Sequence, residues 1–167
     1  MDQAPARAPA LREPSQRVSP RARLMWTAEA GVEAVVLAAV PIVLAGPLDL
    51  FDVPWWAWPL FAVVLLSYVA VVPRWRYLVH RWEVTDTAVY TQTGWWSRER
   101  RIAPMSRIQT VDHVEGALSR LFGLATVTVT TASAAGALGI VGLDKDVARR
   151  LVDELTMKAD AVEGDAT

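Results

Sequence analysis

The chain has 167 residues and a formal net charge of -1 at pH 7, enough for one ordinary domain and a membrane anchor. The near-neutral charge gives no sign of a nucleic-acid partner. The absence of cysteine excludes disulfides and thiolate metal sites.

Composition changes sharply along the chain. Residues 1–23 form a polar lead rich in arginine and proline, which predicts a disordered cytoplasmic tail, and a second disordered tail is predicted over 160–167. Residues 27–72 are almost wholly apolar, whereas residues 74–159 mix charges with alternating apolar residues. This order predicts a membrane segment followed by one soluble domain over residues 74–159.

Two apolar stretches, at about 28–48 and 55–72, predict a hairpin of two transmembrane helices within residues 24–73. A bilayer core about 30 Å thick needs about 20 helical residues, and both stretches approach that length. The second stretch contains no charged residue, whereas the first includes Glu29 and Glu33. A cleaved signal peptide is the alternative for the first stretch. The long polar lead, the two glutamates and the second apolar stretch argue against it.

Basic residues flank this hairpin on one side only. They are Arg7, Arg12, Arg17, Arg21 and Arg23 before the first stretch, and Arg74, Arg76 and Arg81 after the second. The connecting loop, near residues 47–54, has no lysine or arginine and carries two aspartates. By the positive-inside rule, we expect a multi-pass membrane protein with both termini in the cytoplasm.

The soluble part has the pattern of short strands followed by one helix. Strands are predicted in 77–84, 89–93, 95–102, 108–114, 124–131 and 138–143. Gly94 marks a hairpin turn, and Val127 and Val129 alternate with threonines as on a strand with one buried face. Asp144 then precedes a helix, predicted to run to about Lys158, with apolar residues four apart. This order predicts a small, strongly bent sheet closed by a C-terminal helix.

Four features of the sequence resemble the bacterial PH-like membrane protein family of the YdbS type. They are WEVTDTAVYTQTGWWSRERRIAP, SRIQTVDHVEGALSRLFGLATVTVTTA, IVGL before the final helix, and the apolar hairpin upstream. The run SRLFGLATVTV is the most specific. The resemblance implies a bacterial cell membrane protein in which a PH-like split β-barrel, capped by a C-terminal helix, follows the two helices.

Catalytic chemistry has little support in this sequence. His80 and His113 are the only histidines, and Asp112 and His113 are adjacent on a predicted strand, so they face opposite sides. Neither a nucleophile-elbow motif nor a P-loop motif is present. We therefore expect no catalytic, cofactor-binding or metal-binding residue, no small-molecule substrate, and a protein that is not an enzyme.

A group of aromatic and basic residues near the Gly94 turn is a candidate surface for a protein partner or anionic lipid. Its members are Trp95, Trp96, Arg98, Arg100, Arg101 and Arg107. Tryptophans beside arginines suit the headgroup layer of a membrane. The alternative is a solvated hairpin face with two partly buried tryptophans.

Glu29 and Glu33 are the candidate intramembrane polar residues. They are four residues apart and share one helix face. Charged groups inside a membrane span are costly and are often functional. The alternative is that both lie at headgroup depth and pair with Arg23, Arg74 or Arg76.

Two functions from different classes follow. The first is a binding or scaffold module that gathers a protein partner, or copies of itself, at the cytoplasmic membrane face in contact with membrane lipids. The second is a component of a transport or envelope-stress and resistance system, for which Glu29 and Glu33 are the motivation. Replacing both glutamates by glutamine is expected to disable only the second.

Overall fold

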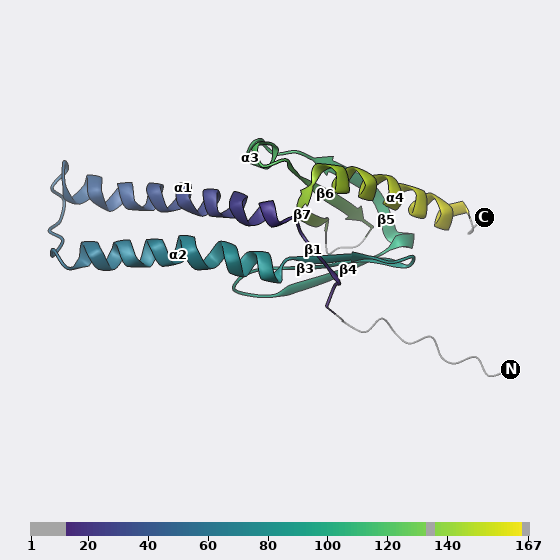
Figure 1. Ribbon diagram of the computed structural model, residues 1–167, viewed down its shortest axis with the longest axis horizontal. Coiled ribbons are helices and arrows are strands. Elements are labelled where there is room, and N and C mark those ends of the chain that lie inside the picture. The colour runs from purple at the N-terminus through teal and green to yellow at the C-terminus, as the bar shows by residue number, and fades with distance from the viewer. Residues whose placement is uncertain (1–12, 133–135, 165–167) are drawn as a thin grey trace.

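The computed structural model describes residues 13–132 and 136–164. Two long antiparallel helices, α1 (Pro20–Ala45) and α2 (Ala57–Val79), extend side by side from one end of a β-rich domain (Figure 1). Proline is favoured at the first position of a helix, where its missing N–H has no partner to lose, and Pro20 occupies it in α1. The Ser19 side chain caps that end by accepting a hydrogen bond from the backbone N–H of Arg21 at 3.3 Å.

Both helices are long and apolar enough to cross a membrane, and only 6% of each helix's most apolar window is buried within the protein. Their outer faces carry exposed branched side chains, such as Val36 at 58% exposed and Leu66 at 69%. An apolar surface of this extent is unusual on a water-soluble domain. The apolar helical hairpin is therefore suited to lipid on its outer surface.

The domain consists of two antiparallel sheets and three short or capping helices. The first sheet has the order β1-β2-β3-β4, with strands β1 (Gln16–Arg17), β2 (Arg81–Val84), β3 (Ala88–Thr93) and β4 (Glu99–Pro104). The second sheet has the order β5-β6-β7, with strands β5 (Ile108–Val114), β6 (Leu124–Thr131) and β7 (Leu138–Asp144). The helices are the 3-10 turn η1 (Met105–Arg107), α3 (Ala117–Leu121) and the C-terminal α4 (Lys145–Gly164).

This architecture confirms the predicted fold class, in which two apolar helices precede a PH-like β domain with a C-terminal helix. In the described residues no strand of one sheet pairs with a strand of the other, so the barrel stays open. The alternation predicted for β6 is present, since Val127 and Val129 are fully buried between partly exposed threonines. On α4, Leu151 and Leu155 face the same core, one helical turn apart.

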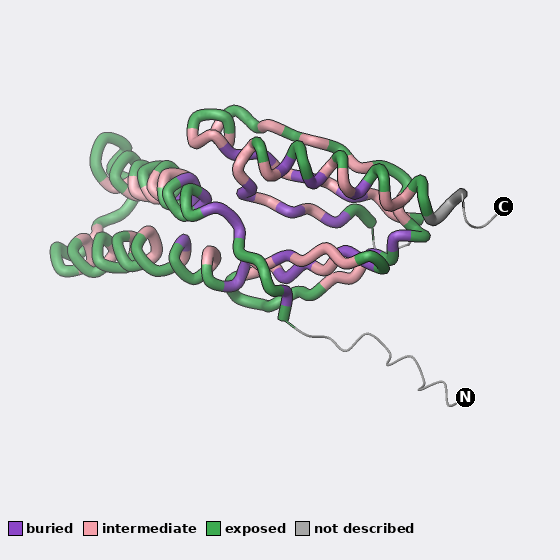
Figure 2. Tube along the Cα trace, turned by 45° about the vertical axis from the view of Figure 1, so that its right-hand side comes forward, coloured by how far each residue is buried: buried purple, intermediate pink, exposed green. Residues whose placement is uncertain are grey.

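The first turns of α1 belong to the domain core. Ala22, Met25 and Trp26 are at most 2% exposed and pack in the same cluster as the β6 valines. Gly142 of β7 has φ +82°, and a Cβ there would lie 2.7 Å from the Ala22 Cβ. A glycine is therefore needed for β7 to approach the helix. Figure 2 shows the buried path continuing from the domain into the start of α1.

Two predicted boundaries at the N-terminal side need correction. The predicted tail over residues 1–23 already contains β1 and the first turn of α1. Ala22, in this first turn, is buried in the domain core, and the high arginine and proline content of the segment obscures this. The strand predicted over 77–84 begins only at Arg81, because α2 continues to Val79.

Two further boundaries differ downstream. The strand predicted over 95–102 begins at Glu99, since the turn after Gly94 takes up residues 94–98. The predicted C-terminal tail over 160–167 is helical as far as Gly164. The tail predictions for residues 1–12 and 165–167 lie outside the described residues.

Candidate functional site

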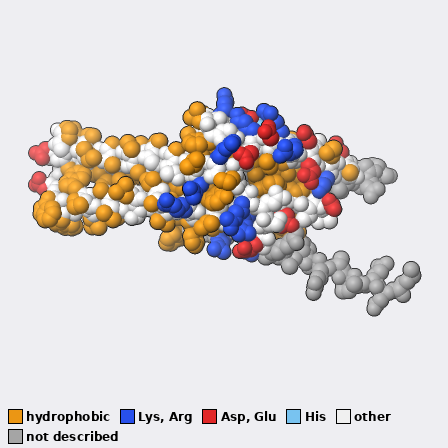
Figure 3. Space-filling model, in the orientation of Figure 1, with side chains coloured by type: hydrophobic (Ala, Val, Ile, Leu, Met, Phe, Trp, Pro, Cys, Tyr) orange, Lys and Arg blue, Asp and Glu red, His pale blue; other side chains and the backbone are white. Residues whose placement is uncertain are grey.

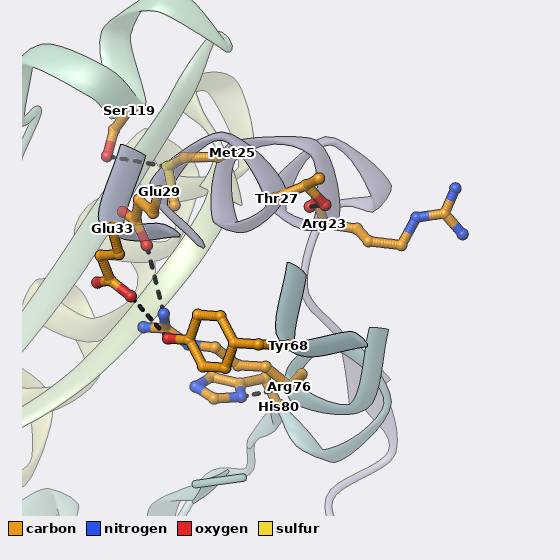
Figure 4. Close-up of polar contacts among 9 residues, drawn as sticks. All are labelled: Arg23, Met25, Thr27, Glu29, Glu33, Tyr68, Arg76, His80 and Ser119. Atoms are coloured by element: carbon orange, nitrogen blue, oxygen red, sulfur yellow. Dashed lines mark hydrogen bonds and ion pairs between the residues drawn. The ribbon is translucent and has the colours of Figure 1, made fainter. Parts of the chain in front are cut away.

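The root of the hairpin, where α1 and α2 meet the β-rich domain, carries an ion pair between the two helices. Arg76 of α2 approaches Glu29 of α1, with 3.3 Å between Nη1 and Oε2. The Arg76 guanidinium also lies over the Trp26 ring, 4.5 Å from its centroid. Figure 4 shows Arg23 pointing away from this pair. Of the three arginines predicted as partners for the glutamates, Arg76 is therefore the one that pairs with Glu29.

Glu33 lies one turn farther along α1 and has a neutral partner. The Tyr68 hydroxyl donates a hydrogen bond to its Oε2 at 2.6 Å. A pocket of about 180 Å³ adjoins both glutamates, and Trp26, Tyr68, Arg76 and Trp95 are among its walls. In the part of the chain that the structure describes, no lysine or arginine forms an ion pair with Glu33.

His80 completes the junction between α2 and the domain. Its ring lies 4.8 Å from the Trp26 ring, and its Nδ1 is 2.7 Å from the backbone carbonyl of Arg76. Burial lowers the pKa of His80 to about 4, and the nearby Arg76 charge acts in the same direction. A base this weak is neutral near pH 7, so His80 serves packing at the junction.

The Trp95–Trp96 pair lies in the loop between β3 and β4. Gly94 has φ +110°, a left-handed conformation that the turn requires. Trp96 is 88% exposed and Trp95 is 49% exposed. Because Trp95 also lines the pocket beside Glu29 and Arg76, the loop returns to the hairpin root. Figure 1 shows the β3–β4 turn beside the domain end of α2.

The predicted basic surface is divided between two faces of the first sheet. The Arg100 side chain donates to Gln92 at 2.8 Å and reaches Glu13 at 3.4 Å, and Arg98 lies 3.9 Å from the same Glu13 oxygen. Arg101 instead pairs with Glu99 at 2.6 Å. It also donates a hydrogen bond to the backbone carbonyl of Ala137, just before β7 of the second sheet. Neighbouring residues on a strand face opposite sides, so these arginines do not form one patch.

Arg101 and Arg107 meet at the open seam between the two sheets. They line a pocket of about 380 Å³, whose other walls include Ile102, Thr131 and Leu138. The adjoining strand β4 is the edge of its sheet. Among the described residues, the Arg107 side chain has no ion pair or hydrogen bond, so its charge is available to a ligand.

A charged cluster that sequence reasoning missed joins β5 to α4. Glu115 pairs with Lys145 at 2.8 Å and with His113 at 3.1 Å, and Arg149 lies 3.9 Å away. The Lys145 hydrogen bond, followed by the one from His113, lowers the pKa of Glu115 to about 2. Thirty positions separate Glu115 from Lys145, so no short-range pattern signals their contact.

The surface of the molecule changes character at the hairpin root. Figure 3 shows apolar side chains covering the two helices, with arginine and lysine side chains beginning where the helices meet the domain. In the described ranges, no group of three or more histidine, aspartate or glutamate residues is placed to hold a metal ion. The side chains gathered at the root and the seam are suited to binding by charge, hydrogen bonding and aromatic contact.

Comparison with known proteins agrees with this architecture. The family model described as "Bacterial PH domain" matches residues 32–159. The chain is 30% identical over 157 residues to the UPF0699 transmembrane protein YdbS of Bacillus subtilis (strain 168), covering 92% of this chain and 98% of the relative. No solved structure is significantly similar to the chain.

Proposed function

The chain belongs to the bacterial PH domain family, and from this premise we propose that it is a membrane-anchored, non-enzymatic binding module. In this proposal it gathers a protein partner at the cytoplasmic face of the membrane. Both apolar helices cross the bilayer, and the arginines that flank them hold the domain on the cytoplasmic side.

The open edge of β4 is the observation that supports partner binding. In the described residues β4 pairs with β3 alone, so its outer backbone groups have no strand beside them. An extended peptide can add to such an edge through main-chain hydrogen bonds, while adjacent pockets select its side chains. The seam pocket, lined by Arg101, Arg107 and Thr131, lies beside this edge and supplies the selective element.

The charges of the seam indicate which peptide it would take. Arg101 is partly neutralised by Glu99, whereas Arg107 has no ion-pair partner in the described part of the chain. A carboxylate from a partner would satisfy the Arg107 guanidinium by a charge-assisted hydrogen bond. The proposed partner is therefore an extended segment with acidic side chains.

Attachment to the hairpin raises the effectiveness of a weak site. The core packing of Met25 and Trp26 joins the domain directly to α1, with no flexible linker between them. A partner that is itself at the membrane then meets the site at high effective concentration. Modest affinity at the seam is sufficient under these conditions.

Site-specific photocrosslinking in native membranes tests this proposal. A photoreactive amino acid at Ile102 should capture the same protein reproducibly, and the double variant Arg101→Glu, Arg107→Glu should abolish the product. Arg150→Glu, an exposed position on α4, makes the same charge change away from the seam and should leave the product intact. A product that survives the seam variant would contradict the proposed site.

A second candidate function is a role in transport, and Glu33 is the observation in its favour. Its carboxylate lies beyond the Glu29–Arg76 pair along α1, without a cationic partner among the described residues. Charged residues at such depth often belong to ion or proton paths. Complementation of a deletion strain by Glu29→Gln, Glu33→Gln distinguishes the two functions, because a binding module keeps its activity and a transporter loses it.

A further inference from the structure

The short helix α3 lies at the same end of the domain as the hairpin root. Its Ser119 hydroxyl is 3.5 Å from the Met25 sulfur of α1. Gly123 comes just after α3, and a Cβ at this position would lie 3.3 Å from the Arg21 side chain of α1. Figure 1 shows α3 and the β3–β4 turn on opposite sides of the hairpin, and Figure 2 shows the same separation after rotation.

The exposed side of α3 is apolar and basic. Leu121 is 81% exposed, and none of the five residues of α3 is fully buried. Leu118 and Phe122 pack partly against the domain core, which fixes the helix in place and turns Leu121 outward. Arg120 beside it is also exposed. A single exposed leucine needs no explanation by itself, so its position relative to the hairpin decides its meaning.

The depth of α3 along the hairpin places this helix just outside the headgroup layer. The exposed apolar surface of α1 begins near Val32, which is 66% exposed, and Glu33 is the charged residue within it. Met25, the residue beside α3, precedes Val32 by seven positions, or about 10 Å of helix. Each headgroup layer of a bilayer is about 5–7 Å thick, so an apolar side chain projecting from α3 toward the hairpin's free end meets that layer.

We propose that α3 is a second lipid-contact site of the domain. Leu121 enters the boundary between headgroups and acyl chains, and the Arg120 guanidinium binds the phosphate of an anionic lipid. Trp96 makes the corresponding contact on the other side of the hairpin. The apolar outer faces of the neighbouring α1 and α2 identify lipid as the occupant of this surface.

Contacts on both sides of the hairpin fix the tilt of the domain on the membrane. β4 runs away from the hairpin, from Glu99 near the root to Pro104 at the far end (Figure 1). The seam pocket is therefore held away from the lipid surface and faces the aqueous phase. The lipid contact of α3 requires only membrane anchoring, so it stands whether or not the seam binds a peptide.

The absence of cysteine allows a direct test in the full chain. Single variants Leu121→Cys, Trp96→Cys and Met157→Cys are labelled with a fluorophore and reconstituted in an equal mixture of phosphatidylcholine and phosphatidylglycerol. Lipids carrying a headgroup-level nitroxide then quench any label in the membrane surface. Met157 is the matched control, an apolar side chain that is 66% exposed on α4, away from the hairpin.

The label at position 121 should be quenched roughly threefold more strongly than the label at position 157, as expected for a side chain in the interfacial layer. Adding Arg120→Glu should reduce this quenching in the anionic mixture and leave it nearly unchanged in pure phosphatidylcholine. Equal, weak quenching at positions 121 and 157 would overturn the proposal. Quenching at 121 that ignores Arg120→Glu in the anionic mixture would overturn the role of the arginine.

Discussion

The two halves of α1 lie in different surroundings although one continuous helix carries both. Met25 and Trp26 in the first half are 2% exposed and belong to the domain core. Val32 and Val36 in the second half are 66% and 58% exposed on the protein itself. The comparison shows that a helix can begin as part of a water-soluble fold and continue as a membrane anchor, with no linker between the two roles.

The largest expected effect comes from a substitution in the buried half of α1. Trp26→Ala deletes a large, fully buried side chain and should lower the free energy of unfolding of the domain by about 3–5 kcal/mol. Leu37→Ala, at a side chain that is 53% exposed, is the control and should change it by less than about 1 kcal/mol. Urea unfolding in detergent micelles, followed by circular dichroism, measures both. Equal losses would show that the two halves are not distinct.

The junction should also give the protein a dependence on pH. Burial lowers the pKa of His80 from 6.5 to about 4, so above pH 6.5 neither the folded nor the unfolded chain carries this proton. As the pH falls from 6.5 toward 4, the unfolded chain binds a proton that the folded chain does not, and stability decreases.

Thermal unfolding between pH 7 and pH 4 checks this expectation. His80→Gln should flatten the decrease in that window, whereas the control His113→Gln, on β5, should leave it in place. A decrease of the same size in the His80→Gln variant would assign the pH dependence to another group.

A smaller effect should separate the two glutamates of α1. Glu29→Gln leaves Arg76 without its ion pair and should lower the free energy of unfolding by about 1 kcal/mol, as for a partly exposed pair. Glu33→Gln still offers an oxygen to the Tyr68 hydroxyl, so its effect should stay within about 0.5 kcal/mol. The same urea titration resolves the two variants, and an equal loss for both would contradict the pairing seen at the root.

Much of the fold follows from local patterns in the sequence. The valine–threonine alternation of β6 and the four-residue spacing of α4 each specify one buried face, and both are present in the structure. β1 and α3 could not be found in this way. β1 has two residues and exists through its pairing with Arg81 and Trp82 far along the chain, and α3 is too short to show a period.

The candidate site was less accessible to sequence reasoning. Arg76 was one of three possible partners for Glu29, and only the packing of α1 against α2 selects it. The division of Arg100 from Arg101 was foreseeable, because adjacent residues on a strand face opposite sides. The seam pocket depends on residues from β4, β6 and β7 meeting in space, which no local pattern reports.

We propose that the exposed half of α1 lies in lipid while the domain at its start lies in the cytoplasm. Reaction of single cysteines with a membrane-impermeant maleimide in intact and permeabilised cells tests it most directly. Asp49→Cys, in the loop, should react in intact cells, Met157→Cys only after permeabilisation, and Val36→Cys in neither. Reaction of Met157→Cys in intact cells, or of Val36→Cys in either preparation, would contradict this placement of the helix and the domain.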